Sequence, residues 1–548
     1  MKKTTLLLPT LFLLNLTASA TVFYLDASKP NNDGDGKSWA NAKQSLAGVV
    51  TLAINNPGQD SIYIKAGTYN IATATSTGDF DNYYGGFQGT ESSPADRLRS
   101  DLDANGVVEP WEFTNPTIFS TTFDSQSTTA INAFEFGTAS TVNPIRINGI
   151  TFTHVVTSNA SAQRTIRISS TYVTFENNII KNCSLFTLNN TTSGNGGTLC
   201  TSFGTISNCL IEKNLVYGTS TADKLLIPGL SFGNGGRFIN SVVRNNQFTI
   251  DFSTSSATTA VNVAGLAVNS NGGGASKIKF ANCLIYNNDG TFIKPAGSTA
   301  VAESSSIVTC MAVSNGMNEV YNCVIANNRT TGLATGGLLV KRYSSQSQTI
   351  QNNVLWNNMN DNLVKNMHVV LSGGTVSVKN NMMNQGSLFT ENSTDVMGNI
   401  FDLSDANTGA KAPMFKTPTS VIGTSTGGTI EKANWSILQG SYFIGKGIAA
   451  SNSTDFVGTA FTTPPSVGAY EYVAPSGFLN TKTVSNIVLV SNKAIVSKIN
   501  GLFTIYSTTG KVINNRHLSE GEKIQLNSGI YFIHTKANGV SSVQKVVI

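Results

Sequence analysis

The sequence is poor in charge, histidine and cysteine, and each shortage argues against a class of protein. Charged residues make up 12% of the 548 residues, about half of the roughly 25% found in an average soluble protein. The net charge of +5 is spread without basic blocks, which argues against nucleic-acid binding. The four histidines are scattered and no Cys-x-x-Cys occurs, so a zinc site is not expected. Hydrophobic residues still reach 40%, enough for a folded core.

Long apolar runs are also missing, except at the N-terminus. Residues 6–16 are mostly apolar, behind Lys2 and Lys3, and Ala18-Ser19-Ala20 follows them. A membrane-spanning helix needs about 20 apolar residues, so the pattern predicts a cleaved signal peptide over residues 1–20. We expect an exported protein with no transmembrane segment in the mature chain.

An irregular repeat centred on asparagine fills the middle of the chain. Each copy places an Asn before a short apolar or β-branched pair, and a second Asn cluster often follows, as at Asn287-Asn288. Successive copies are 28 to 42 residues apart, and their leading residues are Asn148, Asn177, Asn208, Asn240, Asn282, Asn322, Asn352 and Asn380. Repeats of this length indicate a solenoid, an array or a propeller.

The repeat predicts one short strand per turn of chain, bounded by residues that tolerate left-handed corners. No helix-length apolar pattern separates the copies, which disfavours helical repeats and βαβ units. A propeller would need about four strands per unit. We therefore predict an all-β fold, a parallel β-helix in which the repeated Asn amide bonds to the Asn one coil above and below. Cys209, Cys283 and Cys323 share one repeat position, which favours buried free thiols, although pairing of Cys183 or Cys200 stays open.

Several segments resemble exported bacterial proteins of the pectate-lyase-like superfamily. Besides the Asn-centred coils, they are Tyr24-Leu25-Asp26-Ala27-Ser28, residues 36–42, 60–69 and 85–91, and a closing Trp435-Ser436-Ile437-Leu438 with Val467-Gly468-Ala469-Tyr470. The resemblance covers most of residues 22–473 and implies a right-handed parallel β-helix. We expect an N-terminal cap and first coils over 21–130, with an amphipathic helix near residues 46–54, and further coils over 131–473.

The C-terminal part reads as a separate small β domain. After an expected linker at 474–484, residues 485–548 show short alternating strands with turns at Thr509-Gly510 and Asn538-Gly539, typical of an antiparallel sandwich. Residues 501–512, 526–531 and 544–548 together resemble a type IX secretion sorting domain, although the family's Pro-Asn-Pro motif is missing. The resemblance implies outer-membrane secretion machinery as a partner and release or attachment at the surface of a Gram-negative, Bacteroidota-type cell. The alternative is a sandwich that binds carbohydrate.

One motif has a sharp chemical meaning. Residues 101–112 match the twelve-residue calcium loop at every constrained position. Ca²⁺ takes six to eight hard oxygens, and the residues that would supply or relay them are Asp101, Asp103, Asn105, Val107 through its carbonyl, Glu109 and Glu112. The flanking Phe113-Thr114-Asn115-Pro116 reads as extended, so the sequence predicts a single structural Ca²⁺ site, with an ion-free acidic loop as the alternative.

Three function classes compete: an enzyme that cleaves polysaccharide, a glycan-binding or adhesive surface protein, and a passive structural component. Hydrolysis needs two facing carboxylates, and the coils offer only scattered acids. A β-eliminating lyase needs a basic side chain and charge neutralisation on a uronate, often by Ca²⁺. The basic residues available are Lys341, Arg342, Arg237, Arg244 and Lys279, but none lies in a lyase motif, and each is otherwise read as a solvated surface residue. Tyr286 and Trp356 share a repeat position, which predicts an outward ladder that either stacks on sugars or is simply exposed. We expect an exported surface protein that binds polysaccharide or cell-surface glycan or acts as an adhesive or structural surface component. The alternative is a calcium-assisted polysaccharide lyase that acts on uronate-containing glycans.

Overall fold

In a computed structural model, the chain forms two compact units, residues 1–472 and 473–548. The structure describes residues 20–474 and 488–548, so the expected signal peptide and nearly all of the expected linker lie outside the described residues. Within those ranges the residues not described are 57, 72–74, 77–80, 124–130, 138, 142, 160–162, 188–197, 220–228, 252, 254–264, 272–276, 294–308, 315, 333–335, 343–346, 372–375, 385–387, 392–399, 451, 492 and 538–539. No helix among the described residues has the length and apolarity to cross a membrane.

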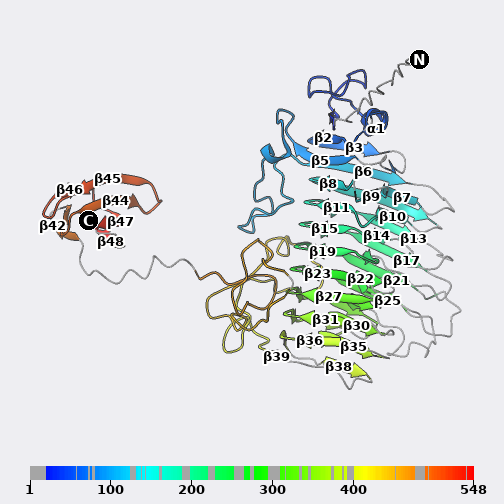
Figure 1. The fold of residues 1–548 in the computed structure, drawn as a ribbon. Coiled ribbons are helices and arrows are strands. Elements are labelled where there is room, and N and C mark those ends of the chain that lie inside the picture. Colours follow the sequence, from blue (N-terminus) through cyan, green and yellow to red (C-terminus); the bar gives the residue numbers. More distant parts are fainter. Residues whose placement is uncertain are drawn as a thin grey trace, which may run out of the picture. The chain divides into compact units, whose positions relative to one another are not determined.

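The first unit is a parallel β-helix, as predicted, in which the strands of successive coils stack into long sheets (Figure 1). One face is an eleven-stranded parallel sheet. In stacking order it contains β1 (Val22–Leu25), β2 (Ser61–Lys65), β5 (Asn82–Phe87), β8 (Ile145–Asn148), β11 (Val173–Glu176), β15 (Thr205–Ser207), β19 (Arg237–Ile239), β23 (Lys277–Ala281), β27 (Met317–Tyr321), β31 (Gln348–Gln351) and β36 (Val376–Lys379).

A second face is a ten-stranded parallel sheet. It contains β4 (Thr75–Ser76), β7 (Ile131–Phe136), β10 (Gln163–Ile168), β14 (Thr198–Ser202), β18 (Leu230–Phe232), β22 (Gly265–Asn271), β26 (Thr309–Ser314), β30 (Leu338–Arg342), β35 (Met367–Leu371) and β38 (Leu388–Glu391).

The third face carries two parallel ladders separated by a corner. Three early strands lead into it: β3 (Gly67–Ile71), β6 (Thr117–Phe123) and β9 (Ile150–Asn159), the last of which pairs with both ladders. The first ladder is β12 (Ile179–Lys181), β16 (Leu210–Glu212), β20 (Val242–Arg244), β24 (Leu284–Tyr286), β28 (Val324–Ala326), β32 (Val354–Trp356), β37 (Asn381–Asn384) and β39 (Ile400–Leu403). The second is β13 (Ser184–Thr187), β17 (Leu215–Thr219), β21 (Gln247–Asp251), β25 (Asp289–Ile293), β29 (Arg329–Thr331) and β33 (Met359–Asn360), followed by the antiparallel β34 (Leu363–Val364).

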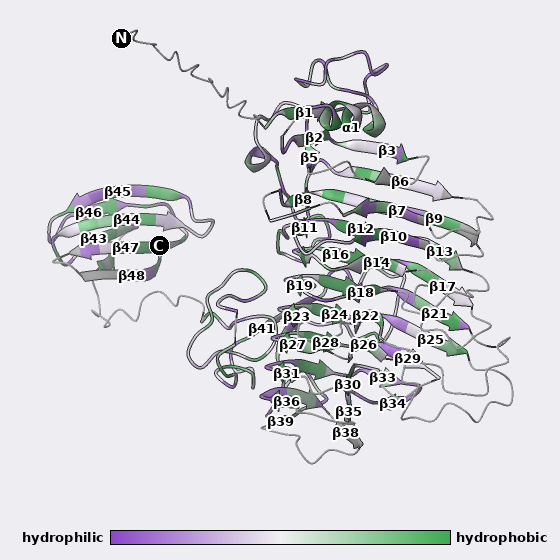
Figure 2. Cartoon of the chain, turned by 45° about the vertical axis from the view of Figure 1, so that its right-hand side comes forward, coloured by the Kyte–Doolittle hydropathy of each residue, from purple (hydrophilic) through white to green (hydrophobic). Residues whose placement is uncertain are grey.

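The middle residue of each three-residue strand in the first ladder points into the coil and forms one stacked apolar core with the other two faces. Ile211, Val243, Ile285 and Ile325 are all fully buried there. Hydrophobic residues recur in the strands throughout the stack (Figure 2). All six cysteines are buried and free, as the repeat position of three of them predicts.

The Asn repeat marks corners, and its hydrogen bonding differs from the prediction. The leading Asn residues adopt the left-handed conformation, with φ of 48° to 57° from Asn177 to Asn380. Of these, Asn282 bonds to its counterpart Asn240. The continuous amide ladder instead runs at the second corner, with Nδ2–Oδ1 distances of 2.8–3.0 Å through Asn214, Asn246, Asn288, Asn328, Asn358 and Asn366. The left-handed Asn points outward, so the residue after it is the one that faces the stacked interior.

An amphipathic helix caps the first coil, as predicted. α1 (Leu46–Ile54) is capped at its N-terminus by Ser45, whose side chain accepts a bond from the Gly48 amide. The helix buries Leu46, Val49 and Ala53. The helix covers apolar residues that the first coil would otherwise expose.

Residues 404–472 were expected to continue the coils, with a last coil at Trp435–Leu438. They instead form an irregular segment with one short antiparallel pair, β40 (Phe415–Thr417) and β41 (Asn434–Ile437). This cover segment lies beside the stack (Figure 1) and bonds to the outward corner residues. Its carbonyl groups at Thr419, Val421, Ile448 and Gly468 accept bonds from the left-handed residues Asn327, Asn287, Asn352 and Asn322.

The second unit contains only antiparallel strands among its described residues. One sheet has the order β42 (Val488–Ser491), β43 (Ala494–Ser497) and β46 (Lys523–Gln525), and the other has the order β45 (Val512–Leu518), β44 (Gly501–Ser507), β47 (Ile530–Ala537) and β48 (Val540–Val547). Phe503, Ile505, Ile524 and Ile533 contribute to a core shared by the two sheets. The small antiparallel sandwich is therefore confirmed as a fold.

Candidate functional site

The outer face of the first ladder is a second apolar core rather than an open surface. Leu210, Val242, Leu284, Val324 and Val354 point out of the coil and are buried. They pack beneath the cover segment, whose contributions include Phe415, Ile430, Trp435, Phe443 and Val467. Both faces of these short strands are thus buried.

The predicted aromatic ladder does point outward, but the expectation that it is exposed is wrong. Tyr286 is 1% exposed and Trp356 is 5% exposed. Their rings lie 5.2 Å and 6.4 Å from the Trp435 ring, centroid to centroid, and the Trp356 indole N–H donates to the Ser404 carbonyl. Covered in this way, the two rings stabilise the cover segment and present no face to a sugar.

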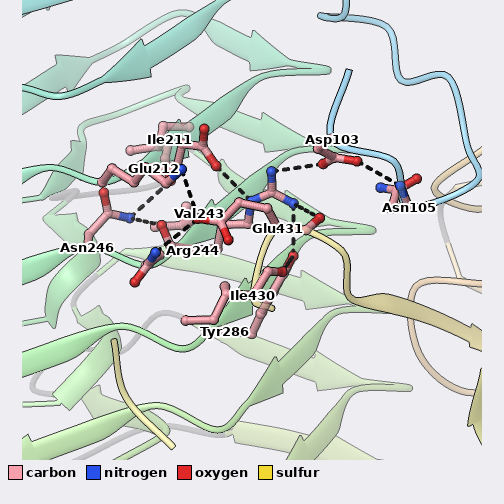
Figure 3. Close-up of polar contacts among 12 residues, drawn as sticks. Asp103, Asn105, Ile211, Glu212, Val243, Arg244, Asn246, Tyr286, Ile430 and Glu431 are labelled. Carbon is pink, nitrogen blue, oxygen red and sulfur yellow. Dashed lines mark hydrogen bonds and ion pairs between the residues drawn. The ribbon is translucent and has the colours of Figure 1, made fainter. Parts of the chain in front are cut away.

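A buried arginine joins the coil, the calcium-type loop and the cover segment (Figure 3). Arg244 donates through Nε to Glu212 at 2.9 Å, and its Nη1 donates to the Tyr286 hydroxyl at 3.2 Å and to the Glu431 carbonyl at 3.0 Å. The same guanidinium bonds to Asp103 at 3.0 Å. Burial opposes the charge, but Tyr286, Glu212 and Asp103 together hold the pKa of Arg244 well above its usual value.

The loop at 101–112 has its carboxylates gathered as a metal site requires. Ligand oxygens of Asp101, Asp103 and Glu112 lie within 4.8 Å of one another. Backbone N–H groups hold these oxygens in place: Gly106 donates to Asp101 at 2.9 Å, and Leu102 donates to Glu112 at 2.7 Å. Gly106 has φ of 86°, the turn for which the pattern requires glycine.

The two remaining side chains of the predicted set also lie at this loop. The Asn105 amide donates to Glu109 Oε1 at 2.6 Å, and Asn105 Oδ1 accepts from the Val107 N–H at 2.8 Å. Glu109 is 7% exposed, and its other oxygen, Oε2, is buried without a hydrogen-bond partner. Burial and the nearby Glu112 raise the pKa of Glu109 to about 9. Asp103 and Glu112 act on the same carboxyl group, and a hard divalent cation would satisfy its unpartnered oxygen.

Two hollows that share Gln247 lie along the second corner, and together we call them the polar groove. The first, of about 620 Å³, lies between the coils and the cover segment and is lined by Lys213, Asn245, Gln247, Thr424 and Glu431, among others. Lys213 pairs with Glu431 at 3.0 Å. Although burial opposes ionisation of the Glu431 carboxyl, the bond from Lys213 contributes to a lowered pKa.

Gln247 also lines the next part of the groove, a hollow of about 390 Å³. Asp289 and Arg329 lie beside it on successive coils, directly in register. They form a bidentate ion pair, in which Arg329 Nε and Nη2 lie 2.8 Å and 2.7 Å from the two Asp289 carboxylate oxygens. The Thr424 hydroxyl donates to the same carboxylate at 2.6 Å. The bond to Asp289 raises the pKa of Arg329.

The sequence analysis missed this groove, although a signal for it exists. Gln247, Asp289 and Arg329 each follow an Asn-Asn pair, which places them at the first position of successive second-ladder strands. A polar residue recurring there predicts a polar row along the stack. The contact of Asp289 with Thr424 has no local signal, because the two positions lie 135 residues apart in the chain.

The basic pair considered for elimination lies on another face. Lys341 is on β30 in the ten-stranded sheet and is 6% exposed. Burial lowers its pKa. The side chain of Arg342 lies outside the described residues. Lys341 therefore lies neither in the groove nor at the calcium-type loop.

Comparisons with known proteins give distant structural likenesses only. No family model and no curated protein matches the chain. Among solved structures, the pectate lyase Pel9A is similar at 15% identity with a TM-score of 0.41, covering 83% of this chain and 97% of that one. A rhamnogalacturonan lyase is similar at 12% identity with a TM-score of 0.30, covering 75% of this chain and 94% of that one. At such distances neither likeness says what this chain does.

Proposed function

We propose that this chain is an exported glycan-binding protein whose parallel β-helix presents the polar groove to an extended polysaccharide. The groove itself carries the proposal: hydroxyls, amides and two ion pairs line a channel along successive coils. Hydroxyl-rich sugars bind through such polar groups, and the axial direction of the groove suits a linear chain.

The groove supports binding better than it supports cleavage. A β-eliminating lyase needs a basic side chain able to accept a proton from the substrate. The two basic side chains that line the groove among the described residues, Lys213 and Arg329, are each held by a carboxylate. A calcium-assisted polysaccharide lyase is the alternative function.

One experiment separates the two functions. The purified chain is tested by affinity electrophoresis against neutral and uronate-containing polysaccharides with Ca²⁺ present, while ultraviolet absorbance follows the unsaturated product of elimination. We expect retention on at least one polysaccharide without a rise in absorbance. The double variant Asp289→Asn/Arg329→Gln should reduce retention at least tenfold, and Lys277→Gln, which removes an exposed pair to Glu319, serves as the matched control. A rise in absorbance would establish the lyase instead. Equal retention of the two variants would exclude the groove as the binding site.

We further propose that the loop at 101–112 binds one structural Ca²⁺. Asp101, Asp103, Asn105, Glu109 and Glu112 would hold the ion, together with the Val107 carbonyl, and the ion would fasten the loop beside Arg244. Calorimetry should detect one Ca²⁺ per chain, lost in Asp101→Ala with Glu112→Ala. Absence of Ca²⁺ binding, or binding unchanged in that variant, would contradict the site.

We also propose that residues 1–20 direct export and that residues 485–548 are read by outer-membrane secretion machinery, so that the protein is secreted or attached to the outer cell surface. The resemblance of residues 501–512 and 526–531 to a sorting domain supports this. Deleting residues 485–548 in a Bacteroidota-type host should trap the chain inside the cell envelope, as measured by fractionation. Unchanged surface delivery would leave the sandwich as a carbohydrate-binding candidate.

A further inference from the structure

A second hollow lies on the ten-stranded sheet, on a different face from the groove. It has a volume of about 300 Å³ and is lined by residues of β10, β14 and β18 and of the turns that follow the last two. The row Arg167, Thr201 and Ser231 crosses three coils in direct register. The floor of this hollow is therefore a polar stripe parallel to the stacking axis.

Two arginines of one strand line this hollow because β10 is locally distorted. In a regular strand, residues three apart point to opposite faces. Here Thr165 and Ile166 are both fully buried, and Thr165 is absent from the otherwise regular pairing of β10 with β7 and β14. Arg164 and Arg167 consequently lie on the same side and both line the hollow.

The two guanidinium groups are only partly neutralised. Arg167 pairs with Glu135 at 3.0 Å, and Arg164 donates to the Asn132 side chain at 3.1 Å. Arg164 Nε is buried without a hydrogen-bond partner. Burial and the neighbouring Arg167 lower the pKa of Arg164, although Glu135 opposes the shift. One carboxylate among these groups leaves a net positive charge that suits an anion.

An exposed aromatic ring completes the hollow. Phe203 follows β14, lines the hollow and is 41% exposed. Its ring rests on Gly233, where a Cβ atom would lie 2.3 Å from the ring carbon Cε1. The absence of a side chain at Gly233 is thus what lets the ring lie close to the backbone of the next coil. An apolar ring held against the surface beside two guanidinium groups is a surface on which a sugar ring can stack.

We propose that this hollow, defined by Arg164, Arg167, Phe203 and Gly233, binds one carboxylated sugar residue, that is, a uronate. The carboxylate would bond to the guanidinium groups, which bind planar carboxylates in a bidentate manner. The pyranose face would stack on Phe203. The site is separate from the groove and stands whether or not the groove binds glycan. On a longer acidic polysaccharide it would act as a second contact.

Isothermal titration with a uronate trisaccharide tests the site, with the neutral trisaccharide of the same linkage as the ligand control. Titrations are made in the Asp289→Asn/Arg329→Gln background, so that loss of groove binding and loss of binding at the hollow are separate readouts. We expect the uronate to bind at least tenfold more tightly than the neutral sugar. Binding should fall at least tenfold in Arg164→Gln/Arg167→Gln and in Phe203→Ala, and should survive in Phe203→Tyr, which keeps the ring.

The matched control for the arginines is Arg146→Gln, because Arg146 pairs with Glu176 at 3.1 Å on another face of the coil. It should bind the uronate like the parent. Should Phe203→Ala lower the melting temperature, the arginine variant and Phe203→Tyr decide the outcome. The proposal is overturned if the parent does not bind the uronate, if the neutral sugar binds equally well, or if the arginine variant binds as tightly as Arg146→Gln.

Discussion

The first ladder of strands separates two apolar cores that are built in different ways. On the inner side, Ile211, Val243 and Ile285 stack on residues of the same kind from neighbouring coils. On the outer side, Leu284 and Tyr286 pack against a segment that begins more than 100 residues later in the chain. The inner core therefore grows with each repeat, whereas the outer core depends on one non-repeating segment. Local loss of the outer core is possible without unfolding the coil.

The largest difference between the two cores is expected when the central aromatic ring of the outer core is removed. Trp435 belongs to the cover segment and is fully buried against the first ladder, and Trp435→Ala should cost about 3–5 kcal/mol. Hydrogen exchange should rise in residues 404–472 while the coil remains protected. Ile285→Ala, an inner-core change costing about 2–5 kcal/mol, should instead lower the cooperative unfolding transition. Identical exchange patterns in the two variants would mean that the two cores unfold as one.

The buried arginine links the two regions, and its loss should be nearly as severe. Arg244→Met leaves Glu212 buried without its ion-pair partner, a change that costs about 3–5 kcal/mol. Urea denaturation measures the effect. Arg146→Met, which breaks an exposed pair, should cost at most about 1 kcal/mol. Adding Glu212→Gln should restore part of the stability lost in Arg244→Met, because the charge that Arg244 compensated at Glu212 is then removed.

We expect the protonation of His154 to contribute to loss of stability in acid. Burial lowers the pKa of His154 to about 4, against 6.5 for an exposed histidine. Between pH 6.5 and 4, His154 is protonated in the unfolded chain but stays neutral in the folded chain. The free energy of unfolding therefore falls as the pH drops from 6.5 to 4. The loss reaches about 3 kcal/mol at pH 4. His154→Gln should flatten the decline in unfolding free energy over this range, and an unchanged slope would contradict the assignment.

The smallest effect should come from one amide that fastens the cover segment. Asn287 Nδ2 donates to the carbonyls of Val421 and Gly423. Asn287→Gly removes the amide while tolerating the left-handed φ of 52°, and should cost about 1–2 kcal/mol. Exchange should increase near residues 419–425. Asn288→Ala, in the adjacent amide ladder, should loosen the second corner of the coil instead.

Much of the coil could be predicted from the sequence because its interactions repeat. The Asn residues at left-handed corners, the apolar pairs and the capping helix at Leu46–Ile54 each follow from local preferences. The same repeat also held an unused signal: Leu284, Ile285 and Tyr286 are apolar in succession, which is typical of strands buried on both faces. That signal indicates a cover over Tyr286 and Trp356, where an exposed ladder was expected.

The sequence alone determined the parallel coil, the small antiparallel sandwich and the twelve-residue pattern at 101–112, because short-range spacing specifies each of them. Only the tertiary structure decided that residues 404–472 lie along the outside of the coil. It also decided that Arg244 joins Asp103 to Glu212, and that Arg164, Arg167 and Phe203 share one hollow. These contacts join positions that no periodicity relates, so they arise only when the stacked coils bring distant side chains to one surface.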